Sequence, residues 1–239
     1  MPPSDAVAPP GSPPSLSVPL EAAHLRDTRV GYDAIAEDYA ERFRATLDEN
    51  PWDRAVLDTF AEMAAATGGR VLEAGSGPGR VTAYLHARGV RVRGLDLSQA
   101  MVALARREHP EVAYEQGDMT SLAEADGALA GLVAWYSVIH VPPALHPEVF
   151  AEFHRVLGEG GLLLLGFQMQ SEEGEVLHFD EAFGHAVRLD FHRLSMDRVC
   201  EQLAHAGFAV EARTVREPRD NESPVRQGTV LARKRARER

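Results

Sequence analysis

The chain has 239 residues, 44% hydrophobic and 26% charged, so it is long enough to bury a full core in one globular domain. No apolar run reaches the ~20 residues that span a bilayer, and the N-terminus lacks the basic start and apolar block of a secretory signal, so we expect a cytoplasmic protein with no membrane partner. The net charge of −11 argues against nucleic-acid binding. The single cysteine, Cys200, argues against a disulfide framework and an all-cysteine zinc site.

The chain begins with a proline-rich segment that is followed by two helical patterns. Residues 1–22 hold few large apolar side chains, which predicts a disordered tail because such a segment cannot offset its ordering entropy. One helix is predicted over residues 31–43 and another after Pro51, and we expect these N-terminal cap helices to occupy residues 23–66. The apolar stripe of the first helix consists of Tyr32, Ile35, Ala36, Tyr39 and Phe43.

Strand and helix patterns alternate through the rest of the chain. Strands are predicted over 70–75, 90–96, 111–116, the apolar run 129–141, 162–167, 208–215 and 228–233. Helices are predicted over 80–89, 98–109, 145–157 and 195–206. This alternation requires a parallel sheet that is covered on both faces. We therefore predict an α/β fold with a Rossmann-like, seven-stranded, mostly parallel sheet, an antiparallel C-terminal hairpin and helices on both faces.

Two segments depart from this alternation. Residues 168–194 are polar and rich in His, Phe and Asp, and we expect them to form a substrate-lid insert within a single domain over residues 23–232. Residues 233–239 are basic, and a short basic run at an exposed end beside an acidic body is predicted to be a solvated tail.

A glycine-rich turn, Glu-Ala-Gly-Ser-Gly-Pro-Gly-Arg over residues 73–80, follows the first predicted strand. Such a turn lets the backbone approach a ligand closely and directs a helix N-terminus at it. The turn does not match a dinucleotide site, because that fingerprint requires glycine where Arg80 stands and because a pyrophosphate would be repelled by the Glu73 carboxylate. It does not match a P-loop either, because no Gly-Lys-Ser/Thr follows. The turn therefore favours a ligand that has a cationic amino-acid end and no phosphate.

The stretch Val-Leu-Glu-Ala-Gly-Ser-Gly-Pro-Gly-Arg-Val resembles motif I of the class I S-adenosylmethionine-dependent methyltransferases. Further stretches resemble the family in order and spacing across roughly residues 28–232. Asp96 ends the second strand, where an acid can accept both ribose hydroxyls. The resemblance implies S-adenosylmethionine as the cofactor, S-adenosylhomocysteine as its product, and the same fold that the strand pattern predicts.

The resemblance also implies the residues of the cofactor site. Gly117 and Asp118 resemble the segment that contacts adenine, and Trp135 with Ser137 resembles the segment near the methyl donor. Packing and helix capping remain alternative roles for these residues, above all for the two tyrosines of the first helix. The expected cofactor-binding residues are Tyr32, Tyr39, Glu73, Ala74, Gly75, Gly77, Gly79, Asp96, Leu97, Met101, Gly117, Asp118, Met119, Trp135 and Ser137.

His140 is the candidate general base, because it lies just beyond the fourth strand, where ligands collect in open parallel sheets. The alternative is a loop histidine that bonds to backbone before Pro142. No metal site is expected, since the chain lacks the His-Glu-x-x-His pattern or a comparable ligand spacing. The expected substrate contacts are Tyr136, His140, Phe179, His192 and Arg193.

These observations predict a methyltransferase that acts on an oxygen, nitrogen or carbon nucleophile of a small molecule, a secondary metabolite being one such acceptor. A base is needed only where the nucleophile carries a proton that must leave. An NAD(P)-dependent oxidoreductase on the same fold and a non-catalytic cofactor-binding protein remain alternatives. We expect a monomer or a homodimer.

Overall fold

The computed structural model describes residues 20–170, 174–219 and 224–236. Most of the predicted N-terminal tail, residues 1–19, and the last three residues of the predicted basic tail lie outside these ranges. The first helix, α1 (Leu20–Phe43), begins before the predicted start at residue 31 and inside the predicted tail. None of the described helices is both long and apolar enough to cross a membrane.

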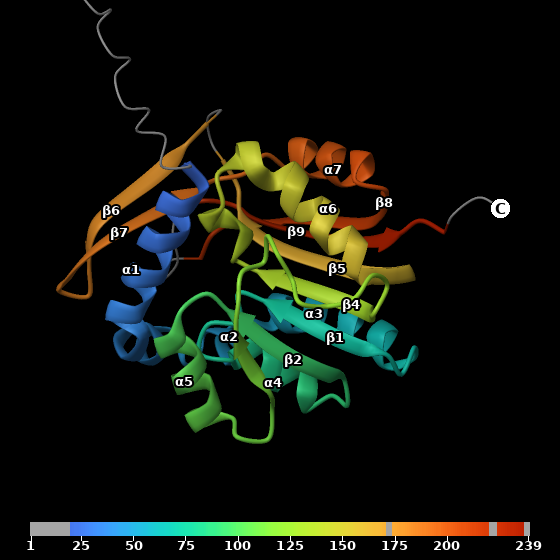
Figure 1. The fold of residues 1–239 in the computed structure, drawn as a ribbon, viewed down its shortest axis with the longest axis horizontal. Coiled ribbons are helices and arrows are strands. Elements are labelled where there is room, and N and C mark those ends of the chain that lie inside the picture. Colours follow the sequence, from blue (N-terminus) through green and yellow to red (C-terminus); the bar gives the residue numbers. More distant parts are fainter. Residues whose placement is uncertain (1–19, 171–173, 220–223, 237–239) are drawn as a thin grey trace, which may run out of the picture.

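Seven strands form one sheet in the order β3-β2-β1-β4-β5-β9-β8 (Figure 1). All neighbouring pairs from β3 to β5 are parallel, and β9 is antiparallel to both β5 and β8. The predicted parallel sheet with an antiparallel C-terminal hairpin is therefore confirmed. The strands are β1 (Arg70–Ala74), β2 (Arg91–Asp96), β3 (Tyr114–Gln116), β4 (Leu129–Trp135), β5 (Leu157–Gln168), β8 (Phe208–Arg216) and β9 (Gln227–Lys234).

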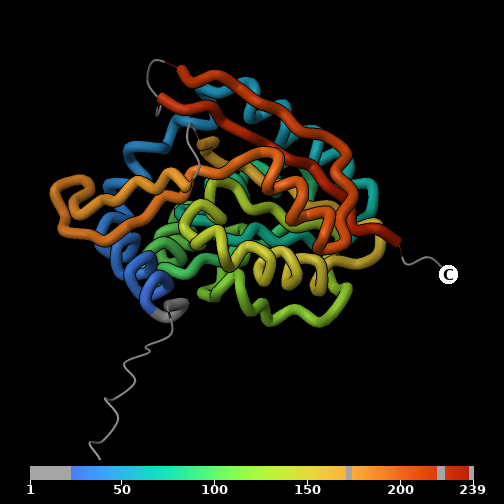
Figure 2. The backbone as a smooth tube through the Cα atoms, turned by 90° about the horizontal axis from the view of Figure 1, so that it is seen from above, coloured from blue at the N-terminus to red at the C-terminus, as the bar shows by residue number. Residues whose placement is uncertain are grey.

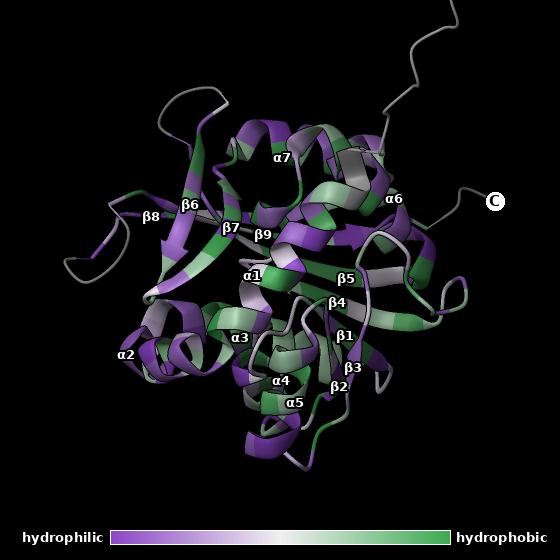
Figure 3. Cartoon of the chain, turned by 60° about the vertical axis from the view of Figure 1, so that its left-hand side comes forward, coloured by the Kyte–Doolittle hydropathy of each residue, from purple (hydrophilic) through white to green (hydrophobic). Residues whose placement is uncertain are grey.

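The side chains of the central strands alternate between two apolar layers, one on each face of the sheet. Val71 and Val133 pack against α3 (Pro51–Ala65) and α4 (Arg80–His86) on one face. Leu72 and Leu132 pack against α6 (His146–Val156) and α7 (Met196–His205) on the other. Figure 3 shows the central strands mostly in green, as expected of strands that are buried on both sides.

The remaining helices lie at the carboxyl end of the sheet or beside its β3 edge. These are α2 (Thr46–Glu49), which the sequence did not predict, α5 (Gln99–Glu108), and the short 3-10 turns η1 (Val138–His140) and η2 (Pro143–Leu145). Helix α5 begins where the sequence predicted, because the Ser98 hydroxyl accepts a hydrogen bond of 3.1 Å from the backbone N–H of Met101. Ser195 caps α7 in the same way.

The segment between β5 and α7 forms a two-stranded hairpin, β6 (Val176–Ala182) and β7 (His185–His192), outside the main sheet. Figures 1 and 2 both show this hairpin alongside α1. Ile35 of α1 packs with Val187 and Leu189 of β7, and His185 Nε2 lies 3.0 Å from Asp38 Oδ2. The hairpin and α1 therefore form one layer across the carboxyl end of the sheet.

Candidate active site

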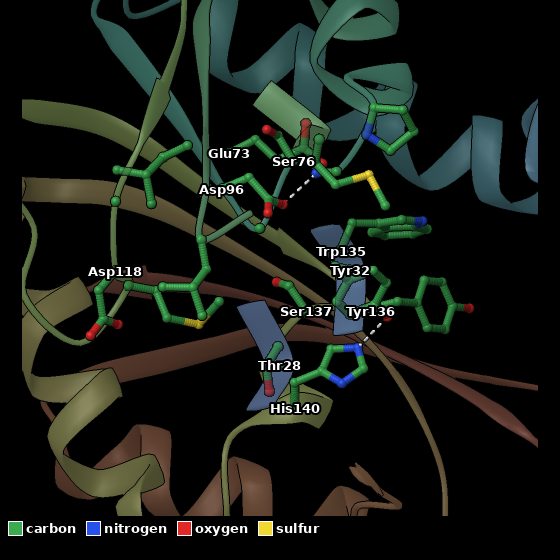
Figure 4. A pocket seen from close by; sticks show the side chains of 18 of the residues that line it. Thr28, Tyr32, Glu73, Ser76, Asp96, Asp118, Trp135, Tyr136, Ser137 and His140 are labelled. Atoms are coloured by element: carbon green, nitrogen blue, oxygen red, sulfur yellow. Dashed lines mark hydrogen bonds between the residues drawn. The ribbon is translucent and has the colours of Figure 1, made fainter. Parts of the chain in front are cut away.

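A pocket of about 890 Å³, its open mouth included, lies between α1 and the carboxyl ends of β1, β2 and β4 (Figure 4). Ligands in open parallel sheets bind at this edge, next to the point where the strand order reverses, which here lies between β1 and β4. The pocket brings together these residues predicted from the sequence: Tyr32, Tyr39, Glu73, Gly75, Gly77, Asp96, Leu97, Met101, Gly117, Asp118, Met119, Trp135, Tyr136, Ser137 and His140.

The glycine turn after β1 forms the floor of the pocket. Gly75 and Gly77 have φ angles of 77° and 52°, in the left-handed region that side chains rarely adopt. A Cβ on Gly75 would also stand 2.3 Å from the Ser137 Cβ. The N–H of Gly77 donates a 2.6 Å hydrogen bond to Asp96 Oδ2. The positive φ therefore favours glycine at both positions, and the close approach of Ser137 excludes a side chain at Gly75.

Two carboxyls, the buried Glu73 and the half-buried Asp96, stand at the ends of β1 and β2. Burial raises the pKa of Glu73 to about 8, although the Thr82 hydroxyl, which donates a hydrogen bond to its Oε2, works in the opposite direction. Burial also raises the pKa of Asp96 to about 6, against the backbone N–H groups of Ser98 and Gly77 that hydrogen-bond its oxygens. Proximity of the two acids adds to the rise at Glu73.

Polar atoms without a protein partner lie beside these acids. Ser76 Oγ and Arg80 Nε are buried and have no hydrogen-bond partner among the described residues, and both side chains line the pocket. Arg80 is anchored through Nη1, which donates a 2.6 Å bond to the backbone carbonyl of Phe43 at the end of α1. Buried polar atoms without a partner are costly, so this end of the pocket fits a polar ligand.

Asp118 stabilises its own turn. Its two oxygens accept hydrogen bonds of 2.8 Å from the backbone N–H of Thr120 and 2.7 Å from the Thr120 hydroxyl. The side chain nevertheless lines the pocket, as do its neighbours Gly117 and Met119. The turn-forming role and a position at the ligand site are therefore both present at Asp118.

The segment after β4 forms the wall between the glycine turn and His140. The Ser137 hydroxyl donates a 2.6 Å bond to the backbone carbonyl of Ala74, which ties this wall to β1. Tyr136 has a φ of 55°, uncommon for a residue with a side chain, and its ring meets that of Trp135 edge-on at 5.5 Å. Unusual backbone conformations of this kind cluster at functional sites.

His140 and Tyr32 form a hydrogen-bonded pair inside the pocket, with His140 Nε2 and the Tyr32 hydroxyl 2.8 Å apart (Figure 4). His140 Nδ1 lies 3.0 Å from the backbone carbonyl of Asp190 in β7. Because a carbonyl only accepts, Nδ1 carries the proton, and Nε2 of the neutral ring accepts from Tyr32. Burial lowers the pKa of His140 to about 4 and raises that of Tyr32 well above its usual value, so both side chains are uncharged near pH 7.

The sequence left open whether His140 points to the pocket or bonds to backbone, and the structure shows both. The turn that carries it is held by the buried ring of His146, whose Nε2 lies 3.2 Å from the Val138 carbonyl and 3.0 Å from the Val141 carbonyl. The Phe191 ring packs edge-on against His140 at 4.6 Å. His140 is thus fixed from its own turn and from the hairpin.

Five of the predicted site residues are not among those that line the pocket: Ala74, Gly79, Phe179, His192 and Arg193. Gly79 begins α4 and packs on Tyr114, which leaves no room for a side chain. Phe179 is 41% exposed and touches Phe191, the ring next to His140. Arg193 forms an ion pair with Glu175 instead of facing the pocket.

The pocket also contains residues that the sequence did not single out: His24, Leu25, Thr28, Ser76, Pro78, Arg80, Val81, Leu95 and Val141. Ser76, Pro78 and Arg80 interleave with the glycines of the motif. His24 and Thr28 lie on the part of α1 that precedes residue 31, where the helical pattern was predicted to begin. Their four-residue spacing to Tyr32 is the sequence feature that could have placed them on the same helix face as Tyr32.

The segment of the chain that carries most of the pocket is similar to known proteins. The methyltransferase-domain family matches residues 71–161, which contain the glycine turn, both acids and His140. Demethylmenaquinone methyltransferase of Beutenbergia cavernae is 34% identical over 135 residues, 54% of this chain and 54% of that protein. The chain thus matches about half the length of this curated relative.

Two solved structures share the fold over most of their length. The 1,6-didemethyltoxoflavin-N1-methyltransferase of Burkholderia thailandensis has a TM-score of 0.60 at 23% identity and covers 96% of this chain and 95% of its own. Magnesium protoporphyrin IX methyltransferase from Synechocystis has a TM-score of 0.66 at 16% identity and covers 89% and 97%. These likenesses show that the chain shares the fold of these methyltransferases, and residues 71–161 match the methyltransferase-domain family.

Proposed function

We propose that the chain transfers a methyl group from S-adenosylmethionine to an oxygen, nitrogen or carbon atom of a small molecule. One observation carries this proposal: a single pocket joins the acid-and-glycine turn at one end to the Tyr32–His140 pair at the other (Figure 4). Methyl transfer needs adjoining spaces for the methyl donor and the acceptor, because holding donor and nucleophile in contact supplies much of the rate enhancement. The relatives named above carry methyltransferase names, which supports the same reaction class.

The cofactor would be held by the end of the pocket that carries the glycine turn. When bound, S-adenosylmethionine supplies a methyl group attached to a positively charged sulfur. Asp96 would accept hydrogen bonds from the ribose hydroxyls, and Glu73 would face the cationic amino-acid end. Ser76 Oγ and Arg80 Nε, buried here without a partner among the described residues, offer further polar contacts.

His140 would act as the general base for a nucleophile that must lose a proton. Its Nε2 carries no proton and its electron pair accepts the Tyr32 hydroxyl, through which a proton can reach it, since Nδ1 donates its own proton to the Asp190 carbonyl. The low pKa of His140 keeps this electron pair available at neutral pH. The Asp190 carbonyl also stabilises the ring in its protonated form, because it accepts a hydrogen bond from the positively charged imidazolium.

The proposal is tested by measuring S-adenosylhomocysteine release with a panel of phenols, amines, carboxylic acids and carbon nucleophiles. We expect acceptor-dependent turnover for at least one class. For that acceptor, His140→Ala should lower kcat by about 10²–10⁴-fold, the usual contribution of a general base, while S-adenosylhomocysteine affinity stays within about twofold.

His205→Ala is the matched control, because His205 is exposed at the end of α7 and, among the described residues, its ring bonds to the Glu201 carbonyl of its own helix. It should retain full activity. Turnover that is equal in the wild type and His140→Ala would remove His140 from the mechanism, and binding without turnover of any acceptor would contradict catalysis.

A further inference from the structure

The pocket-facing side of α1 carries a row of polar side chains. His24, Thr28 and Tyr32 follow one another at four-residue intervals, so they lie on one face of the helix. All three line the pocket. In Figure 4, Thr28 and His140 lie at the end opposite to Glu73 and Asp96. A helix that only packed against the domain would present an apolar stripe here.

We call this end the acceptor compartment and define it by His24, Leu25, Thr28, Tyr136, His140 and Val141. Both ring nitrogens of His24 are buried and neither has a hydrogen-bond partner among the described residues. A buried ring nitrogen without a partner is destabilising, whereas a neutral imidazole can both donate and accept. A molecule in the pocket that offers a donor to one ring nitrogen and an acceptor to the other would satisfy His24.

The acceptor compartment contains no Asp, Glu, Lys or Arg among the described residues. The charged side chains of the pocket are Glu73, Arg80, Asp96 and Asp118, and all come from β1, β2 or the segments that follow β1 and β3. The low pKa of His140 leaves that ring uncharged as well. An anionic acceptor would therefore be buried here without a counter-charge, which is costly.

We propose that the acceptor compartment binds an uncharged molecule through its hydroxyl groups, that His24 is the residue that hydrogen-bonds this acceptor, and that the reaction is methylation of a hydroxyl oxygen. A hydroxyl is the simplest uncharged group that both donates and accepts a hydrogen bond. This inference rests on the proposed function and narrows its acceptor from oxygen, nitrogen or carbon to a hydroxyl oxygen.

The Tyr32–His140 pair gives the proton a path. An acceptor hydroxyl next to the Tyr32 oxygen would pass its proton to that oxygen while Tyr32 gives its own proton to His140 Nε2, 2.8 Å away. Tyr32 ends the step protonated, as its raised pKa favours. The acceptor oxygen forms the new bond to the methyl carbon, and the sulfur keeps the electron pair of the broken carbon–sulfur bond.

The test compares three probes that share one ring system: 1-naphthol, 1-naphthylamine and 1-naphthoate. Each is titrated by calorimetry into protein saturated with S-adenosylhomocysteine. We expect 1-naphthol to bind at least tenfold more tightly than 1-naphthoate and more tightly than 1-naphthylamine. His24→Ala should weaken 1-naphthol binding about fivefold, the value of one hydrogen bond, and His24→Gln should restore part of it. His205→Ala should bind like the wild type.

The inference is overturned if 1-naphthoate or 1-naphthylamine binds as tightly as 1-naphthol, if none of the three binds, or if His24→Ala has no effect. Affinity for S-adenosylhomocysteine is measured first on each variant, so that a folding defect in His24→Ala is detected independently. If S-adenosylhomocysteine binds and another acceptor class is methylated, only this inference falls. If the wild type does not bind S-adenosylhomocysteine, the proposed function falls too.

Discussion

Asp96 links the glycine turn to the end of the second strand. One of its oxygens accepts the Gly77 N–H at 2.6 Å and the other accepts the Ser98 N–H at 2.8 Å. The same carboxyl therefore fixes the turn, supports the start of α5 and faces the pocket. This combination explains why an acid at this position matters both for local structure and for the proposed ribose contact.

Glu73 makes a prediction about the dependence of stability on pH. Its pKa is raised by burial to about 8, so the folded state binds more protons than the unfolded state between its ordinary pKa and pH 8. Stability therefore falls as the pH rises through this range, by at most about 1.4 kcal/mol per pH unit from this group. Glu73→Gln should reduce this slope, as measured by urea unfolding at pH 5, 6.5 and 8.

Glu62→Gln is the control for this measurement, because Glu62 is exposed on α3. It should reproduce the pH profile of the wild type. Parallel profiles for Glu73→Gln and the wild type would show that Glu73 is not the group responsible. The change to Gln keeps an acceptor for the Thr82 hydroxyl, so the local hydrogen bond need not be lost.

The glycines and acids of the site could be predicted from the sequence, because their spacing is dictated by a strand-to-helix turn. The partners of Tyr32 could not. Its place on the helical stripe with Ile35 predicted a ring facing inward, but the bond to His140 joins residues 108 apart in the chain and depends on how α1 crosses the sheet. Side-chain pairs of this kind follow from tertiary packing, which local patterns do not encode.

At the scale of elements, α1 is held over the pocket from several directions. Asp33 Oδ1 accepts hydrogen bonds from the Ser98 hydroxyl at 2.6 Å and from the Ala100 N–H at 3.0 Å, both at the start of α5. Glu37 pairs with Arg107 of the same helix through two bonds of 2.8 Å. These contacts fix the helix that carries His24 and Tyr32.

The apolar contact between α1 and β7 predicts a difference between two substitutions on one helix. Ile35 is 2% exposed and packs on Val187 and Leu189, so Ile35→Ala should lower the free energy of unfolding by about 2–5 kcal/mol. Val30 is 56% exposed, and Val30→Ala should change the free energy of unfolding by less than about 0.5 kcal/mol. Urea unfolding measures both. Equal costs for the two variants would contradict the described interface.

Element boundaries show where local patterns suffice. Helices α5 and α7 start at the predicted serines because a side-chain cap is a local feature. The start of α1 was placed too late, since its first turns lack an apolar stripe. The hairpin β6–β7 was expected only as a lid insert, although Val187, Leu189 and Phe191 alternate as in a strand. Val187 and Leu189 pack with Ile35 of α1, and Phe191 packs against both this cluster and the main core.

At the scale of the whole molecule, the strand order and the layer formed by α1 and the hairpin create one pocket that would hold the proposed cofactor and acceptor side by side. The strand order reverses between β1 and β4, which leaves a crevice at the carboxyl end of the sheet, and α1 with the hairpin covers this crevice. The charged side chains of the pocket lie at the proposed cofactor end, whereas the residues that define the proposed acceptor compartment include no Asp, Glu, Lys or Arg. This division follows from topology, because the acids end strands and the histidines come from α1 and the η1 turn.

The central claim, that the acid-and-glycine turn binds S-adenosylmethionine, is tested most directly by calorimetric titration of S-adenosylhomocysteine and NAD side by side. The wild type should bind S-adenosylhomocysteine and not NAD. Asp96→Ala should lose at least about tenfold in affinity, since hydrogen bonds to a charged group contribute about 1.5–3 kcal/mol. Asp197→Ala, at an exposed position on α7, should bind like the wild type. Binding of NAD instead, or of neither ligand, would contradict the account.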